Sequence, residues 1–265
     1  HEEFWESVWE YFNIGKLNNQ FDVLHGSSIY ESKWFDGAKV NYCERVFAKR
    51  DGHTAIIAIN EECQQRTVSY QELYFQVANI ARYMKSIGLT KGDRVAAYMT
   101  NSLEAVVAFL ATASIGAIWS SCSPEFGVNG VVQRFGQIEP KILIASDGYR
   151  YAGKNNNRVE QVNQLIEKIP SIKHTILVEN LAGNKVDFTD NRILWNEIVM
   201  DERVLEFEQV EFDHPLWILY SSGTTGRPKP IVHGHGGILL EHYKTLSFHL
   251  DIQDSDRFFW FTTVG

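Results

Sequence analysis

Helical and strand-like periods of apolar residues follow one another along most of the chain. Ser69 and Glu72 have the spacing of a capping box, and the apolar residues after them recur at helical intervals until Gly88. Together these features predict a helix that begins after Ser69 and ends before Gly88. The segment GDRVAAYM that follows predicts a strand. The apolar residues of the helix are Leu73, Val77, Ile80, Ala81 and Met84.

The same order of helix and strand then repeats. Asn101 and Glu104 mark the start of a second helix, AVVAFLATASI is its buried run, and AIWSSC predicts a second strand. Ser123 and Pro124 open a third helix, which Pro140 ends before the strand KILIAS. The apolar residues of this third helix are Val128, Val131, Val132, Phe135 and Ile138.

A fourth helix and strand complete the series. The strand HTILVEN follows Pro170, and the helix before it carries the apolar residues Val159, Val162, Leu165, Ile166 and Ile169. Strands that alternate with helices through short links predict an α/β fold, in which a parallel sheet is covered by helices on both faces. Ligands of such sheets bind at the carboxyl ends of the strands.

Two regions outside this series have no clear period. Residues 1–50 are rich in aromatic side chains, which predicts an amino-terminal extension packed on a main domain of residues 51–265. Residues 182–213 are polar and acidic, and they predict a surface excursion with one helix around Trp195. The aromatic residues of the extension are Phe4, Trp5, Trp9, Tyr11, Phe12, Trp34 and Phe35.

The composition excludes several classes of protein. With 265 residues, of which 44% are hydrophobic, the chain can bury a sizeable core. A net charge of -8 gives no basic field for nucleic acid or an anionic membrane, and no apolar run reaches the roughly 18 to 20 residues of a membrane span. Cys43, Cys63 and Cys122 show neither a disulfide framework nor metal-type spacing, so we expect the reducing cytosol.

The stretch LYSSGTTGRPKPIVHGHGG has a distinct chemistry. The apolar run 216–220 predicts a buried strand before it, and Ile231 and Val232 resume an apolar run after it, so the loop is held at both ends. Gly223 and Gly226 permit a tight backbone whose N–H groups can turn toward an anion. Side-chain donors for phosphate oxygens are Ser221, Ser222, Thr224, Thr225 and Lys229. This donor set predicts a nucleotide triphosphate site.

Other motifs fit this chain poorly. A Walker loop needs G-x-x-x-x-G-K-[ST], whereas here Arg227 and Pro228 separate Lys229 from Gly226. The chain has no G-x-S-x-G nucleophile elbow, and no G-x-G-x-x-G follows an early strand as in dinucleotide-binding folds. From these residues alone, a solvated polar loop without function remains the alternative.

The full string YSSGTTGRPKPIVHG resembles the ATP-phosphate signature of the acyl-adenylate-forming superfamily of acyl-CoA synthetases. That signature usually has glycine after the lysine, whereas Pro230 stands there, which is typical of the acetoacetyl-CoA synthetase branch. WFDGAKVNYCE and the block from GDRVAAYM to QIEPKIL also resemble that branch. The resemblance covers nearly the whole chain and identifies it as the amino-terminal portion of such an enzyme.

This resemblance implies an ATP-dependent acid–thiol ligase that acts on small molecules. The carboxylate of acetoacetate would attack the α-phosphorus of Mg-ATP, giving an acyl-adenylate and pyrophosphate, and the thiol of coenzyme A would then displace AMP. By position, Ser221 to Gly226 would wrap the phosphates, Thr224 or Thr225 would hold the magnesium complex, and Lys229 would pair with the pyrophosphate portion. Thr225 and Lys229 are thus the candidate catalytic residues.

Three further features have two interpretations each. GYRYAGK, with Arg150 and Lys154, resembles a region where relatives place basic side chains near the 3'-phosphate of coenzyme A, although the spacing differs by one residue; a solvated basic turn is the alternative. FFWFTTVG resembles a segment leading into the acyl pocket, but for Trp260 core packing is favoured. His233 and His235 lack an acidic or cysteine partner, so we expect loop or helix-start positions rather than metal ligands or bases.

The two ends of the sequence indicate a segment of a longer protein. The chain begins at His1 without a methionine and ends inside the apolar run RFFWFTTVG. The resemblance implies that the later half of such enzymes supplies further residues for magnesium, ribose and adenylation, so we expect little or no ligase activity from this chain alone. A ligase for another short acid, such as acetate or propionate, stays open as an alternative. So do a non-catalytic nucleotide- or CoA-binding module, against which the intact Thr224, Thr225, Gly226 and Lys229 argue, and a pure interaction domain. The sequence does not determine the oligomeric state.

Overall fold

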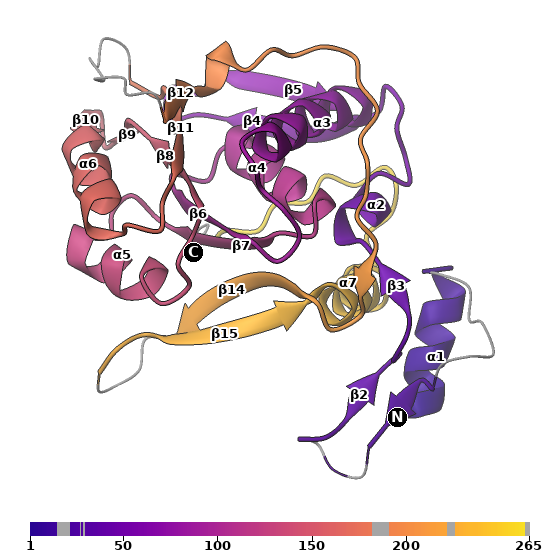
Figure 1. The fold of residues 1–265 in the computed structure, drawn as a ribbon. Coiled ribbons are helices and arrows are strands. Elements are labelled where there is room, and N and C mark those ends of the chain that lie inside the picture. The colour runs from indigo at the N-terminus through magenta and orange to yellow at the C-terminus, as the bar shows by residue number, and fades with distance from the viewer. Residues whose placement is uncertain (15–21, 27, 29, 182–190, 222–225, 263–265) are drawn as a thin grey trace.

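The centre of the fold is a sheet whose strands follow the order β12-β11-β8-β6-β7-β14-β15 (Figure 1). Neighbouring strands are parallel, except that β15 runs antiparallel to β14. The predicted α/β fold is therefore confirmed. The computed structural model describes residues 1–14, 22–26, 28, 30–181, 191–221 and 226–262. The strands are β6 (Arg94–Tyr98), β7 (Ile118–Cys122), β8 (Ile142–Ser146), β11 (His174–Val178), β12 (Arg192–Leu194), β14 (Pro215–Ser221) and β15 (Lys229–Gly234).

Helices cover both faces of this sheet (Figure 1). They are α3 (Tyr70–Ser86) and α4 (Leu103–Ser114) on one face, and α5 (Val128–Phe135) and α6 (Val159–Lys168) on the other. The side chains of β8 alternate between the two cores, because Ile142 and Ile144 pack with α3 and α4 while Leu143 and Ala145 pack with α5 and α6. A strand buried on both faces has to be apolar without alternation, which is why KILIAS has no period of two.

The helices begin where a side chain or a glycine provides a cap. At the start of α3 the Glu72 N–H donates to Ser69 Oγ at 3.1 Å, and the Ser69 N–H donates to Glu72 Oε2 at 2.7 Å, so the predicted capping box is confirmed. Helix α4 is capped by Ser102, whose hydroxyl accepts from the Ala105 N–H at 3.4 Å. The start predicted at Asn101 was therefore wrong by one residue.

The third helix begins later than its sequence predicts. Helix α5 starts at Val128, so the opening at Ser123 and Pro124 was wrong. The buried hydroxyl of Tyr98 lies 2.8 Å from the carbonyl oxygens of both Pro124 and Phe126 and donates toward them. The carbonyls of Pro124 and Phe126 accept hydrogen bonds from a tyrosine of β6 and not from N–H groups of a helix. The segment before α5 therefore forms a turn.

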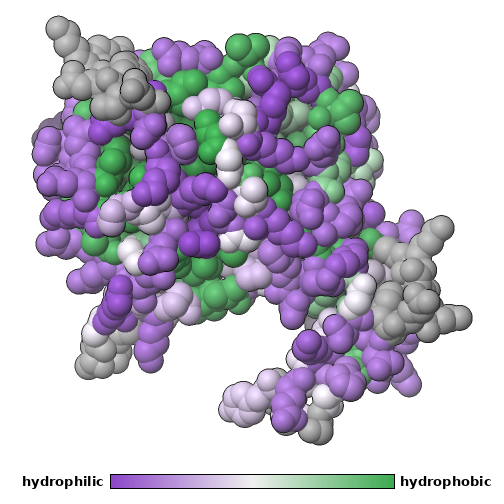
Figure 2. Space-filling model, viewed as in Figure 1, coloured by the Kyte–Doolittle hydropathy of each residue, from purple (hydrophilic) through white to green (hydrophobic). Residues whose placement is uncertain are grey.

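The amino-terminal arm contains a helix that the aperiodic aromatic residues did not predict. Glu2–Tyr11 form α1, from which the Trp9 ring stacks on Phe35 with centroids 4.6 Å apart. The ring centroid of Phe35 lies 5.0 Å from that of Phe212, a residue just before β14. The arm extends from the body at the lower right of Figures 1 and 2. Its other elements are β1 (Leu24–His25), β2 (Lys33–Trp34), β3 (Lys39–Val40) and α2 (Tyr42–Val46).

The polar region after β11 is exposed over most of its described residues, as a surface segment is expected to be, but it is also tied into the fold. Residues 182–190 lie outside the described residues; beyond them β12 joins the sheet, and η1 (Trp195–Glu197) is the short helix predicted around Trp195. The Asn79 side-chain amide donates to the Asp201 carbonyl at 2.7 Å. A bond from a side chain to the backbone leaves no apolar period in the sequence, so this attachment could not be predicted. Three apolar residues of the region, Leu205, Val210 and Phe212, are buried as well.

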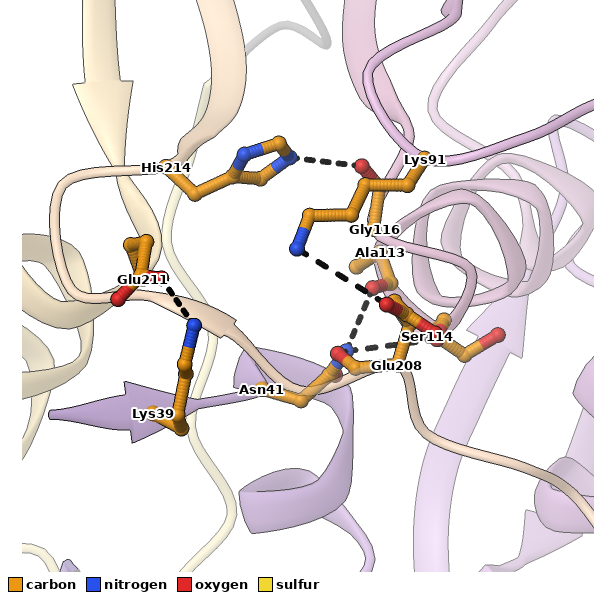
Figure 3. Close-up of polar contacts among 9 residues, drawn as sticks. All are labelled: Lys39, Asn41, Lys91, Ala113, Ser114, Gly116, Glu208, Glu211 and His214. Carbon is orange, nitrogen blue, oxygen red and sulfur yellow. Dashed lines mark hydrogen bonds and ion pairs between the residues drawn. The ribbon is translucent and has the colours of Figure 1, made fainter. Parts of the chain in front are cut away.

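Asn41 joins three segments of the chain (Figure 3). Its side-chain amide donates to the Ala113 carbonyl at 2.9 Å and to the Glu208 carbonyl at 2.8 Å, and its Oδ1 accepts from the Cys43 N–H at 2.9 Å. One side chain therefore caps α2, meets the end of α4 and holds the connection that leads through β13 (Val210–Glu211) to β14. Around it Figure 3 shows the ion pairs Lys39–Glu211 and Lys91–Glu208 and the bond from His214 to the Gly116 carbonyl.

The carboxyl-terminal residues differ from their prediction. After β15 the chain forms α7 (His235–Lys244) and η2 (Thr245–His249), and residues 250–262 form neither helix nor strand. Trp260 is 65% exposed, so the predicted core packing was wrong, because no strand places its ring against the sheet. The remaining elements are two hairpins, β4 (Thr54–Ile59) with β5 (Gln65–Ser69) and β9 (Gly148–Tyr151) with β10 (Lys154–Asn157).

Candidate functional site

The glycine- and hydroxyl-rich loop closes the hairpin of β14 and β15. Ser221, the last residue of β14, is the register partner of Lys229, the first residue of β15. Directly opposed residues of an antiparallel pair place their side chains on the same face, so two predicted phosphate ligands stand together at the mouth of the loop. Gly226 is described as well, whereas Ser222, Gly223, Thr224 and Thr225 lie outside the described residues.

The backbone at Gly226 has a conformation that favours glycine. Its φ is +116°, and a Cβ at this position would have no heavy atom within 4 Å. The glycine is therefore required by conformation and not by crowding, and the space beside its backbone is open. Lys229 is also exposed, while Ser221 is half-buried.

The loop lies at the carboxyl edge of the sheet, as predicted. Strand β14 ends at Ser221 and runs parallel to β7, which ends at Cys122 and in turn runs parallel to β6. Burial raises the pKa of the Cys122 thiol to about 12, so the side chain beside the loop strand is a neutral thiol at pH 7. Parallel strands carry their ligand sites at this edge.

The residues that support the hairpin from outside the sheet give no signal in the sequence. The Tyr220 hydroxyl donates to the Arg134 carbonyl at 2.7 Å, and Gln137 Nε2 donates to the Pro228 carbonyl at 3.0 Å. Arg134 ends the polar face of α5 and Gln137 follows that helix. Nothing in their spacing distinguishes them from solvated residues, and only the fold brings them to the loop.

The predicted coenzyme A contact lies on the β9–β10 hairpin. Arg150 is on β9, and Lys154 begins β10 as the register partner of Tyr151. Arg150 forms an ion pair with Glu62 from the turn between β4 and β5, while Lys154 is exposed. The hairpin directly follows β8, so both candidate sites lie at the carboxyl edge of one sheet, with β6 and β7 between their strands.

The two histidines after the loop have structural partners. His235 is the first residue of α7, as expected of a helix-start residue, whereas His233 lies within β15 and not in a loop. Trp217 Nε1 donates to His233 Nδ1 at 2.8 Å, and the Tyr42 N–H donates to His235 Nδ1 at 3.1 Å. Among the described residues, no three His, Cys, Asp or Glu side chains are grouped to hold a metal ion.

Comparisons with known proteins agree on one family. The model of the AMP-binding enzyme family matches residues 43–265. Acetoacetyl-CoA synthetase of Mus musculus is 36% identical over 278 residues, covering 99% of this chain and 41% of that protein. Acetoacetyl-coenzyme A synthetase of Rhizobium meliloti (strain 1021) is 37% identical over 267 residues, with the same two coverages.

A solved structure has the same fold. Acetoacetyl-CoA synthetase from Streptomyces lividans superposes with a TM-score of 0.93 at 40% identity, over 100% of this chain and 41% of that one. The resemblance first found in the loop motif is therefore confirmed along the chain. The chain spans 41% of the length of these relatives.

Proposed function

The chain belongs to the AMP-binding enzyme family, and from this premise we propose that it is the amino-terminal part of an acetoacetate–CoA ligase. The whole enzyme activates acetoacetate with ATP to acetoacetyl-AMP and transfers the acyl group to coenzyme A. The similarity to two acetoacetyl-CoA synthetases, at 36% and 37% identity, supports this choice of acid. We assign residues 1–50 to an extension and residues 51–265 to the first part of the AMP-binding large domain.

The proposal rests chiefly on the pairing of Ser221 with Lys229 at the mouth of the loop. A hydroxyl and an ammonium on one face of a hairpin, beside the open backbone of Gly226, are suitable donors for phosphate oxygens. The carboxylate oxygen attacks the α-phosphorus, and the bond from that phosphorus to the bridging oxygen of pyrophosphate breaks. Lys229 then offsets the charge gained by pyrophosphate. The proposed set is completed by Ser222, Gly223, Thr224 and Thr225.

Magnesium and coenzyme A are the other ligands of the proposed enzyme. Magnesium in nucleotide sites is held largely by phosphate oxygens and water, and we assign a supporting hydroxyl to Thr224 or Thr225. Arg150 and Lys154 are the proposed contacts for the 3'-phosphate of coenzyme A. Because Arg150 is paired with Glu62, a phosphate there replaces a carboxylate that already balances the guanidinium.

We place the enzyme in the cytosol, where it serves fatty acid and ketone body metabolism. Cys43, Cys63 and Cys122 are free thiols, in keeping with a reducing compartment. None of the helices that the structure describes is long and apolar enough to cross a membrane. The partners we propose are small molecules, and a net charge of -8 gives no general attraction to nucleic acid.

Thermal unfolding with and without Mg-ATP tests the proposal. A ligand that binds only the folded chain stabilises it, by about 2.7 kcal/mol at 100 times its Kd. We expect Mg-ATP to raise the unfolding midpoint, and we expect Lys229→Ala and Thr225→Ala to lose that rise. Lys168→Ala, at the exposed end of α6, is the matched control and keeps it. A folded parent chain whose midpoint Mg-ATP leaves unchanged would contradict the site.

Turnover assays separate the candidate acids. We expect no acetoacetate-dependent release of AMP from this chain alone, and release by a protein extended past Gly265. AMP release with acetate or propionate in preference to acetoacetate would favour another short-acid ligase. Binding of Mg-ATP without AMP release from any of these acids would favour a non-catalytic module.

A further inference from the structure

In the described residues, the backbone pairing that joins the loop-bearing hairpin to the rest of the sheet lies near the base of the hairpin. Strand β14 pairs with β7 at Trp217 and Trp119, and Ser120 Oγ donates to the Ile218 carbonyl at 2.7 Å. From Ile218 the strand continues to Ser221, about 10 Å farther at roughly 3.3 Å per residue. Strand β15, on the other side, is the last strand of the sheet. Nearer the loop, the Tyr220 side chain contacts Ser120 of β7, and further bonds come from another element.

The carboxyl end of α5 supplies these further bonds, and Figure 1 shows this helix beside the hairpin. The Tyr220 hydroxyl donates to the Arg134 carbonyl at 2.7 Å, and Gln137 Nε2 donates to the Pro228 carbonyl at 3.0 Å. Tyr220 is on the strand that enters the loop, and Pro228 is on the segment that leaves it. Both sides of the loop are thus bonded to one end of one helix.

These bonds are held in a fixed arrangement. Pro228 is buried, and burial raises the pKa of Tyr220 to about 12, so its hydroxyl remains a donor at neutral pH. Gln137 uses its side-chain amide twice, since Nε2 also donates to the Gln133 carbonyl at 2.7 Å. Its backbone N–H donates at 3.0 Å to the Arg134 carbonyl, the same carbonyl that accepts from Tyr220. The two bonds to the hairpin therefore come from one hydrogen-bonded turn.

Each bonded residue directly precedes a proposed phosphate ligand. Tyr220 precedes Ser221, and Pro228 precedes Lys229. We propose that Tyr220 and Gln137 are positioning residues that set the distance between Ser221 and Lys229 before the triphosphate binds. This inference rests on the proposed function of the loop. Donors that are already in place bind an anion more tightly, because less conformational entropy is lost when the anion binds.

Two substitutions remove the bonds with little change in shape. Tyr220→Phe deletes one hydroxyl, and Gln137→Met keeps the length of the side chain without its donor. The matched controls are Tyr11→Phe, at a tyrosine that is 72% exposed, and Gln133→Met, at an exposed position of α5. We expect titration calorimetry to show about a two- to tenfold loss of Mg-ATP affinity in each test variant, the effect of one hydrogen bond, and none in the controls.

The same variants distinguish positioning from general stability. Affinity is measured well below the unfolding midpoint, where each variant is folded, and the midpoint without ligand is measured separately. A purely structural role would lower the midpoint and leave the affinity of the folded chain unchanged, which would overturn the inference for that residue while the proposed function stands. Absence of Mg-ATP binding in the parent chain would overturn the proposed function and this inference with it.

Discussion

The backbone N–H of Tyr42 donates to Nδ1 of His235 across 3.1 Å, joining the start of α2 to the start of α7. The lone pair that accepts this bond exists only on the neutral imidazole. His235 is fully buried, and this burial, with smaller contributions from His214 and Lys91, lowers its pKa to about 3. Its pKa in the unfolded chain is near 6.5. Folding therefore depends on an uncharged His235.

We expect the free energy of unfolding to fall as the pH decreases from about 6.5 toward 3. In this window the unfolded chain binds a proton that the folded chain does not, so stability rises with pH. His235→Asn keeps an acceptor for the Tyr42 N–H but cannot titrate, so its stability should depend less on pH. Urea unfolding at pH 7 and pH 5 measures the difference, with the exposed His25→Asn as control. Equal pH dependence in parent and His235→Asn would refute the assignment.

Asn41→Asp should destabilise the chain far more than its small change in structure suggests. The carboxylate can still accept from the Cys43 N–H, but it places an oxygen against the carbonyls of Ala113 and Glu208, which lose their donor. Buried groups without a partner cost about 1–3 kcal/mol each. Urea unfolding beside Asn155→Asp, an exposed position on β10, measures the effect. Similar losses in the two variants would contradict the role of Asn41.

Two adjacent glycines in the first turn of α7 should respond oppositely to alanine. A Cβ on Gly236 would lie 2.1 Å from Cδ2 of Phe212, whereas a Cβ on Gly237 would have no heavy atom within 4 Å. Gly236→Ala should therefore cost about 1–3 kcal/mol through overpacking. Gly237→Ala should gain up to about 1 kcal/mol from helix propensity. Unfolding free energies of the two variants check this contrast, and effects of the same sign would contradict the packing described.

The three thiols should differ sharply in their reaction with iodoacetamide. Cys63 is exposed, whereas Cys43 and Cys122 are buried, and burial raises the pKa of both buried thiols, that of Cys122 to about 12. The reactive form is the thiolate, so we expect one modification in the folded chain and three after unfolding in urea. Mass spectrometry of digested samples locates them. Rapid modification of Cys43 or Cys122 under native conditions would count against the packing of α2 or β7.

Local signals explain what the sequence predicted about the fold. Ser69 and Glu72 are three residues apart, so a capping box is visible in the sequence and present in the structure. The start of α5 was missed because Tyr98, a distant residue, bonds the carbonyls of Pro124 and Phe126. Contacts between residues far apart in sequence leave no period that a sequence reading can detect.

The candidate site also contains residues that a local motif predicts and residues that only the fold brings together. Ser221, Gly226 and Lys229 were predicted because the loop carries its own motif, and the structure places the Ser221 and Lys229 side chains opposite each other. Gln137 was missed because a side-chain amide just after an amphipathic helix gives no sign of its acceptor. The ion pair of Arg150 with Glu62 was missed for the same reason, since it joins two separate hairpins.

Strand β15 begins beside the loop and ends beside the buried His235, so its length separates the two. The strand has six residues, so Lys229 and His235 are about 20 Å apart at roughly 3.4 Å per residue. Free-energy effects at sites more than about 7–10 Å apart, without shared partners, are additive. Protonation of His235 therefore changes the fraction of chains that are folded. It leaves unchanged the intrinsic dissociation constant of the folded chain for phosphate.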